Sequence, residues 1–260
     1  VDVVVDALFG IGLARDISGR AEAAIRALNR CGAPVLALDL PSGLDADSGR
    51  VWGVAVRAAA TLTFIGLKAG LFTGAGREHS GEIYFDDLGT PAGLFDGETP
   101  QALRITRDDL QGLLPRRARH AHKGDAGRVL LVGGAPGMGG ALRLAGEAAY
   151  RAGAGLVRLA THGIHCASLM ASRPELMVHG VETALELRRL LSPPSVLAVG
   201  PGLGQDPWAR ALWATALESP CLQVVDADAR TLLSQDPVRR DDWILTPHPG
   251  EMARLTGTKG

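Results

Sequence analysis

The most informative part of the sequence is Arg128-VLLVGGAPGMGGALRLAGEAAYRAGAGLVRL-Ala160. Apolar runs at 129–132 and 156–159 predict two buried strands, and apolar residues at helical spacing over 141–152 predict a helix between them. Five of the eight residues that precede this helix are glycine, at positions 133, 134, 137, 139 and 140. Glycines at a helix N-terminus let a ligand approach backbone N–H groups, so this density favours a ligand-facing loop over a turn built only for packing. The loop is neither a P-loop nor a clean G-x-G-x-x-G.

The same alternation continues to the end of the chain. Strands are predicted at 174–180 and from Ser195, Leu222 and Trp243, and helices at 161–171, 181–191, 207–218 and near Gly250. Alternating elements of these lengths predict an α/β fold, with a mainly parallel sheet covered on both faces. Its ligand crevice is expected at the carboxyl ends of the strands.

The first half of the chain places polar residues at predicted strand ends. Apolar runs beginning at Val1, Pro34, Ala60 and Glu82 predict four strands, and residues 22–31 predict a helix. Three strand ends then present Asp6, Asp39 with Ser42, and Lys68 towards one edge of the sheet. Converging acids and a lysine can transfer protons or hold a cation, although each residue taken singly is better explained by a capping or solvated role.

Composition narrows the function classes. The chain has 260 residues, a formal net charge of -1 and three cysteines, Cys31, Cys166 and Cys221. This near-neutral charge does not indicate binding to nucleic acid or to an anionic membrane. The spacing of the cysteines indicates neither disulfides nor a zinc site. His162, His165 and Cys166 are close in sequence, but without a further ligand they are interpreted as packing and surface residues. With no signal peptide or apolar run of about 18 residues, a cytoplasmic protein is expected.

Three motifs of the first half, VDALFGIGL, LDLPSGLDADSG and TLTFIGLKAG, resemble the second half of the NAD(P)H-hydrate epimerase domain. The resemblance implies that Asp6 and Ser42 help to hold a potassium ion. It implies that Asp39 binds substrate and acts in acid–base catalysis, with Lys68 as a second catalytic residue. It also implies that one loop contacts the phosphates of the substrate, through Gly10, Ile11, Gly12, Leu13, Ala14, Arg15 and Asp16.

In the second half, HKGDAGRVLLVGG, GMGGA, RAGAGLV, AVGPGLG, VVDADA and ILTPHPGEM together resemble the ADP/ATP-dependent NAD(P)H-hydrate dehydratase domain, which has a ribokinase-like fold. The resemblance implies that Ala141, Gly202 and His248 contact the hydrated nucleotide and that Asp226 lines the same crevice. It also implies ADP or ATP with magnesium as the second ligand. Taken alone, His248 would more simply stabilise the turn of its Thr-Pro-His-Pro-Gly-Glu motif.

The order of the motifs resembles the bifunctional NAD(P)H-hydrate repair enzymes. It predicts the C-terminal part of a Rossmann-like epimerase domain at 1–98, a linker and domain entry at 99–118, and the N-terminal part of a ribokinase-like dehydratase domain at 119–260. The implied function is epimerisation of the R and S forms of hydrated NADH or NADPH, followed by ADP-dependent dehydration of the S form. Family members are expected to form homo-oligomers at full length.

Three features of the family have no counterpart in this chain. These are a glycine- and asparagine-rich loop upstream, a catalytic aspartate further along the dehydratase domain, and a lysine-glycine segment that binds the nucleotide. Lys259-Gly260 follows the histidine motif too closely to be that segment. The chain is therefore expected to be a fragment truncated at both ends, with reduced or no activity. The alternatives are a ribokinase-fold kinase for another small molecule and a non-catalytic nucleotide-binding remnant. A Rossmann dehydrogenase is disfavoured, because no clean G-x-G-x-x-G precedes a ribose-binding acid.

Overall fold

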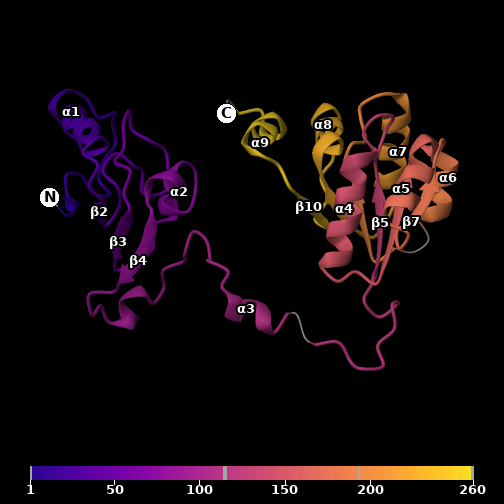
Figure 1. Ribbon diagram of the computed structural model, residues 1–260, viewed down its shortest axis with the longest axis horizontal. Helices are drawn as coiled ribbons and strands as arrows, with labels where there is room; N and C mark the ends of the chain where they lie inside the picture. The colour runs from indigo at the N-terminus through magenta and orange to yellow at the C-terminus, as the bar shows by residue number, and fades with distance from the viewer. Residues whose placement is uncertain (1, 114–115, 192–193, 259–260) are drawn as a thin grey trace. The chain divides into compact units, whose positions relative to one another are not determined.

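The computed structural model describes residues 2–113, 116–191 and 194–258. The chain forms two compact units, Val1–Pro115 and Arg116–Gly260 (Figure 1). The predictions for Val1 and for Lys259-Gly260 lie outside the described residues. In the described part, no helix combines the length and the apolar character that crossing a membrane requires.

The first unit contains a parallel four-stranded sheet in the order β1-β2-β3-β4. The strands are β1 (Val4–Asp6), β2 (Val35–Leu38), β3 (Ala60–Phe64) and β4 (Glu82–Asp86). Asp6 pairs with Ala37, and Ala37 pairs with Thr61, so the carboxyl ends of these strands lie at one edge. The unit also contains α1 (Gly19–Leu28), η1 (Ala69–Leu71), α2 (Gly76–His79), η2 (Ala92–Phe95) and α3 (Arg107–Gln111).

One face of this sheet is covered, and α1 supplies part of the cover. Ile25 of α1 is fully buried in a cluster with Val35 of β2 and Val56. The helix predicted at 22–31 begins earlier and ends at Leu28, so both predicted boundaries were wrong. After Leu28 the backbone bonds shorten to three-residue turns, Arg30 to Ala27 (3.1 Å) and Cys31 to Leu28 (3.2 Å), and the Asn29 side chain donates to the carbonyl of Ala55 (2.9 Å) and accepts from the amide of Arg57 (2.8 Å).

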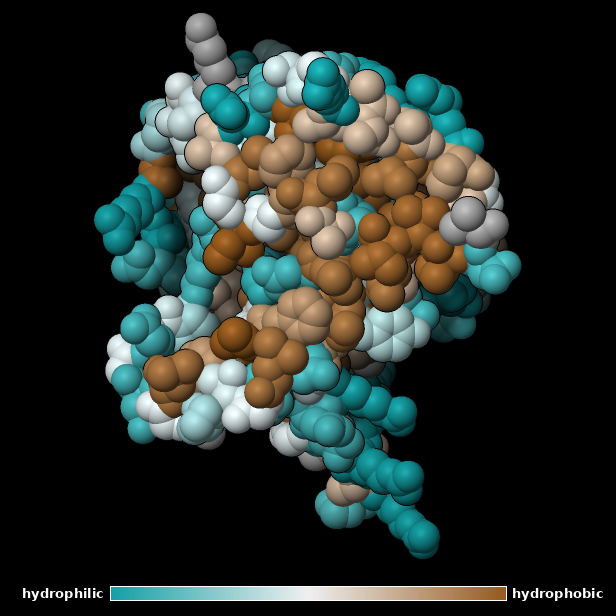
Figure 2. Space-filling view, turned by 90° about the vertical axis from the view of Figure 1, so that its left-hand side faces the viewer, coloured by the Kyte–Doolittle hydropathy of each residue, from teal (hydrophilic) through white to brown (hydrophobic). Residues whose placement is uncertain are grey.

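Apolar side chains also reach the surface of the first unit. Val3 and Val5, before and within β1, are 51% and 53% exposed, whereas the alternate residue Asp6 is buried. Figure 2 shows a broad apolar area on the side of the molecule that it presents. The period of two along β1 places Val4 and Asp6 on the covered face of the sheet and leaves Val3 and Val5 outside.

The second unit contains a parallel six-stranded sheet in the order β10-β9-β8-β5-β6-β7. Its strands are β5 (Arg128–Val132), β6 (Leu156–Thr161), β7 (Met177–Gly180), β8 (Val196–Val199), β9 (Leu222–Val225) and β10 (Trp243–Leu245). Its helices are α4 (Gly139–Arg151), η3 (Gly163–His165), α5 (Cys166–Ser172), α6 (Ala184–Leu190), α7 (Pro207–Leu217), α8 (Ala227–Gln235) and α9 (Pro249–Thr256).

Both faces of this sheet are packed. Leu131 of β5 belongs to a buried cluster with Leu142 of α4 and Leu169 of α5. Its neighbour Leu130 points the other way, into a larger cluster supplied by α6, α7 and α8. The predicted α/β fold with a parallel sheet covered on both faces is confirmed.

Three predicted elements of this unit differ from the structure. The helix predicted at 161–171 starts too early, because Thr161 is the last residue of β6 and its hydroxyl donates to the carbonyl of Gly134 (2.9 Å). The strand predicted at 174–180 begins only at Met177, and the helix predicted from 181 begins at Ala184, where a Thr183–Glu186 capping box fixes its start. The sequence prediction omitted α8 altogether.

Candidate active sites

Asp39 and Lys68 form an ion pair at the carboxyl edge of the first sheet. Asp39 follows β2 with a left-handed backbone (φ 68°), and its amide donates to the carbonyl of Leu62 (2.7 Å). Its carboxylate accepts hydrogen bonds from the amide of Phe64 (3.2 Å) and from the Lys68 ammonium. The ammonium also donates to the carbonyl of Phe64 (2.8 Å). The backbone of β3 thus orients both side chains.

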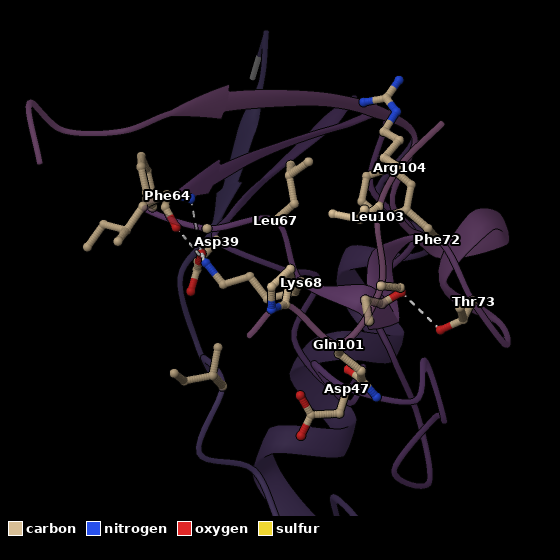
Figure 3. A pocket seen from close by; sticks show the side chains of 16 residues that line it. Asp39, Asp47, Phe64, Leu67, Lys68, Phe72, Thr73, Gln101, Leu103 and Arg104 are labelled. Carbon is tan, nitrogen blue, oxygen red and sulfur yellow. Dashed lines mark hydrogen bonds and ion pairs between the residues drawn. The ribbon is translucent and has the colours of Figure 1, made fainter. Parts of the chain in front are cut away.

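The pair lies in a pocket of about 680 Å³. Figure 3 shows the two charged groups turned towards each other on one side, with Phe72, Leu103 and Arg104 on another. The guanidinium carbon of Arg104 lies 5.5 Å from the ring centroid of Phe72, within the range of a cation–π interaction. Residues 100–104 were assigned to the linker region by sequence, which offers no periodicity or motif that could have placed them in a pocket wall.

Asp6 and Ser42 lie together beneath the same edge, and both are 1% exposed. One Asp6 oxygen accepts from the Ser42 hydroxyl (2.7 Å) and the other from the Ser42 amide (2.8 Å). The hydroxyl oxygen in turn accepts from the amide of Phe9 (2.8 Å). Within residues 2–113, no basic side chain pairs with Asp6. A buried carboxylate without a cationic partner is costly, so this oxygen-rich site could hold a hard cation.

The predicted phosphate loop divides between two pockets. A separate pocket of about 470 Å³ is lined by Leu8, Phe9, Gly10, Gly12, Leu13, Ala14 and Arg15. Ile11 lines the Asp39–Lys68 pocket instead. Asp16 lies beside Gly53, and neither pocket includes it in its lining. The structure therefore brings six of the seven predicted loop residues to pocket walls.

In the second unit, the structure places Ala141 and Gly202 side by side. Gly202 has a left-handed backbone (φ 60°), and a Cβ atom there would lie 2.7 Å from the carbonyl oxygen of Met138 and 3.3 Å from the Cβ of Ala141. The amide of Ala135 donates to the carbonyl of Gly202 (2.7 Å). Two glycine-rich loops, after β5 and after β8, are thus held against each other at the N-terminus of α4. Sequence spacing alone could not have paired them.

His248 is the N-cap of α9. Its Nδ1 accepts from the amide of Gly250 (3.2 Å), and its own amide donates to the carboxylate of Glu251 (2.9 Å). The ring is 63% exposed, and its Nε2 lies 3.5 Å from a Glu251 oxygen. The turn-stabilising role considered from the sequence is therefore present, and contact of the exposed ring with a ligand stays a prediction.

Asp226 stands at the end of β9, as the N-cap of α8. It accepts from the hydroxyl of Thr246 (2.7 Å) and pairs with Arg230 (2.9 Å), which also pairs with Glu251 (2.7 Å). Asp226 and the His248 motif thus belong to one network. The sequence prediction missed Arg230, although its i,i+4 spacing from Asp226 was a usable signal.

His162, His165 and Cys166 serve the packing role expected from the sequence. His165 Nε2 lies 3.0 Å from the carbonyl oxygen of Ala135, and burial raises the pKa of the Cys166 thiol. No cluster of three or more His, Cys, Asp or Glu side chains suited to a metal ion occurs among the described residues.

Two parallel sheets with polar side chains and glycine loops at their carboxyl edges define the class of α/β protein that binds ligands at those edges. The model of the NAD(P)H-hydrate dehydratase family matches residues 129–260, and the model described as YjeF-related protein N-terminus matches residues 1–70. The chain therefore belongs to the NAD(P)H-hydrate dehydratase family. The match to both models disfavours the alternative of a small-molecule kinase.

Comparison with individual relatives supports the same family. The chain is 46% identical to the bifunctional NAD(P)H-hydrate repair enzyme Nnr of Coxiella burnetii, over 98% of this chain and 52% of that protein. It is 42% identical to the enzyme of the same name from Escherichia coli, over 99% of this chain and 50% of that protein. The chain thus spans about half the length of the curated relatives it matches.

Two solved structures resemble the fold. A ribokinase-like superfamily protein from Enterococcus faecalis matches with a TM-score of 0.52 and 32% identity, over 55% of this chain and 52% of that one. The ADP/ATP-dependent NAD(P)H-hydrate dehydratase from Bacillus subtilis, co-crystallised with ATP and Mg²⁺, matches with a TM-score of 0.50 and 30% identity, over 58% of this chain and 55% of that one. These matches support the ribokinase-like assignment made from the sequence.

Proposed function

We propose that this chain takes part in the repair of hydrated NADH and NADPH, with an epimerase site in the first unit and a dehydratase site in the second. The observation that carries the proposal is the Asp39–Lys68 pair in its pocket, beside the loop at 10–15. The Asp39 carboxylate can act as an acid–base group, the Lys68 ammonium is a cation held in place, and the loop offers backbone amides. These groups suit a substrate with a reactive hydroxyl and phosphates.

The epimerase step follows from the chemistry of the substrate. The dihydronicotinamide ring is an enamine, so hydration places the hydroxyl on the carbon next to the ring nitrogen. Transfer of a proton from the Lys68 ammonium through the Asp39 carboxylate to this hydroxyl releases water, while the nitrogen lone pair forms a C=N bond. Addition of water to the opposite face returns the proton to the Asp39–Lys68 pair and inverts the carbon. The carboxylate is well placed to stabilise the cationic ring between these events, and Lys68 holds the carboxylate in position.

The cation implied for the first unit would be held by Asp6 and Ser42. When bound, it would supply the positive charge that the buried Asp6 carboxylate lacks among the described residues. Through Ser42 and Phe9, the same contacts orient the start of the loop at 10–15. A potassium ion is therefore assigned a structural role in shaping the phosphate-binding loop.

In the second unit, the glycine loops that hold Ala141 and Gly202 would receive the hydrated nucleotide, with His248 and Asp226 around the same crevice. ADP or ATP would give a phosphoryl group to the substrate hydroxyl, and loss of that phosphate with the adjacent C–H proton would restore the ring double bond. Magnesium would neutralise the phosphate charge. Such a transfer depends on positioning, which tightly packed glycine loops and a helix N-terminus provide.

The test is to mix the chain with hydrated NADH and follow R/S exchange by chromatography, then to add ADP with magnesium and follow the return of dihydronicotinamide absorbance. We expect the D39N variant to slow exchange at least ~100-fold relative to the unchanged chain. Calorimetry of hydrated NADH binding provides a readout that needs no turnover. Exchange that is equally fast in D39N, or a chain that does not bind the compound, would contradict the proposal.

A further inference from the structure

Arg230 is a buried cation in the second unit. Its side chain is only 5% exposed, and its Nη2 lies 2.9 Å from an Asp226 oxygen and 2.7 Å from a Glu251 oxygen. Among the residues that the structure describes, none accepts a hydrogen bond from its Nε or Nη1. Because an unpaired buried charge is costly, these two carboxylates carry most of the compensation for the guanidinium.

The same two carboxylates hold the motif Thr246-Pro-His-Pro-Gly-Glu251. The Asp226 oxygen that pairs with Arg230 also accepts from the Thr246 hydroxyl (2.7 Å). The Glu251 oxygen that pairs with Arg230 also accepts from the amide of His248 (2.9 Å). One guanidinium nitrogen therefore connects the end of β9 to the entire turn between β10 and α9.

Apolar packing gives this turn little other support. No residue of α9 is fully buried, and Leu255 is the residue of α9 that packs against the neighbouring core cluster. Without the arginine, the carboxylates of Asp226 and Glu251 would repel each other with no positive charge between them. The position of His248 thus depends on Arg230 more than on hydrophobic contact.

We propose that Arg230 is the positioning residue of the second site, which fixes His248 and the start of α9 relative to Asp226. Its effect on ligand binding rests on the function proposed above. Its effect on the position of the 246–256 segment does not, because that effect follows from the charges alone. The two parts can therefore be tested separately.

The test compares the variants R230M, R230K, E251Q and R230M/E251Q by hydrogen–deuterium exchange and by calorimetry with hydrated NADH. In R230M, we expect the amides of 246–256 to exchange at least ~10-fold faster while those of β5 and β8 keep their protection. Binding should weaken at least ~10-fold. R230K should keep most of the protection of 246–256 and most of the binding affinity, because lysine keeps the positive charge. In R230M/E251Q, the amides of 246–256 should exchange more slowly than in R230M, because the second change removes the repulsion between the two carboxylates. The matched control is R239M, since Arg239 is 92% exposed.

The outcomes separate the two proposals. If the unchanged chain does not bind hydrated NADH but R230M still loosens 246–256, the proposed function fails and the positioning role stands. If R230M is folded and 246–256 exchanges as before, or if the double variant exchanges as fast as R230M, the positioning role is wrong. Should R230M fail to fold, E251Q decides the question: it keeps the shape of Glu251 without its charge, and unchanged exchange at 246–256 would overturn the proposal.

Discussion

The Lys68 ammonium bridges the Asp39 carboxylate and the carbonyl of Phe64, so that it joins the end of β2 to the end of β3. The lysine side chain is 17% exposed and the aspartate side chain 26%, so part of each charged group is open to a ligand. The contribution of Lys68 to a reaction would therefore be to hold the Asp39 carboxylate, the proposed acid–base group, in one orientation.

We predict that K68M slows R/S exchange of hydrated NADH by about 10²-fold or more, because a positioned acid–base group contributes about 10²–10⁴-fold. The K68R variant should recover part of the loss, since it keeps the charge with a different shape. Exchange rates measured by chromatography check both. The matched control is R77M, which removes an exposed cation on α2 of the same unit. Equal rates in K68M and R77M would contradict the prediction.

The second prediction concerns the cation at Asp6. Potassium chloride should raise the melting temperature of the first unit above its value in an equal concentration of choline chloride, because ligand that binds only the folded state stabilises it. D6N should abolish this difference, since the amide removes the negative charge that the ion balances. Differential scanning calorimetry gives the measurement. D2N changes an exposed aspartate near the same strand and should keep the potassium effect; an effect that persists in D6N would refute the assignment.

The sequence contains enough to place Asp6, Asp39 and Lys68 at one edge of the first sheet. Each ends or closely follows a predicted parallel strand, and parallel strands end at one edge, so period and polarity alone assign these side chains to that edge. The parallel α/β fold follows from the same alternation. These features are local in sequence, and their spatial consequence is fixed by sheet geometry.

Other features depend on packing that no local pattern encodes. The pocket wall at 100–104 comes from a coil segment, and the contact between Ala141 and Gly202 joins loops that follow two different strands. The burial of Arg230 also escaped prediction: its i,i+4 spacing from Asp226 is a local signal for an ion pair, but an arginine on a helix ordinarily faces solvent. Its burial is explained by Glu251, which only the tertiary fold brings within 2.7 Å.

The third prediction concerns Gly202. We expect G202A to destabilise the second unit by about 2 kcal/mol or more, because it combines left-handed strain with a Cβ atom 2.7 Å from the carbonyl of Met138. G257A is the matched control: Gly257 has a similar backbone (φ 68°), and a Cβ atom there would meet nothing within 4 Å among the described residues. It should cost about 1 kcal/mol. Urea unfolding measures both, and equal losses would show that the contact between the glycine loops is unimportant.

The last prediction concerns Asp45, whose carboxylate closes the turn of the first unit between β2 and β3. The side chain of Ser48 (2.6 Å) and then its amide (2.8 Å) donate to this carboxylate and lower the pKa of Asp45 below its usual 3.8. A depressed folded-state pKa contributes stability that is present above the unfolded value and is lost as the pH falls through the folded value. D45N should therefore melt a few degrees below the unchanged chain at pH 5 to 7, and the gap should narrow below about pH 3.8.

Thermal melts of the unchanged chain, D45N and D47N at a series of pH values check this prediction. Asp47 is an exposed residue of the same turn, so D47N controls for the loss of one nearby negative charge. A gap between D45N and the unchanged chain that stays constant down to pH 3 would mean that hydrogen bonds to an ionised carboxylate do not stabilise the turn. A gap equal to that of D47N would assign the effect to net charge and remove Ser48 from the explanation.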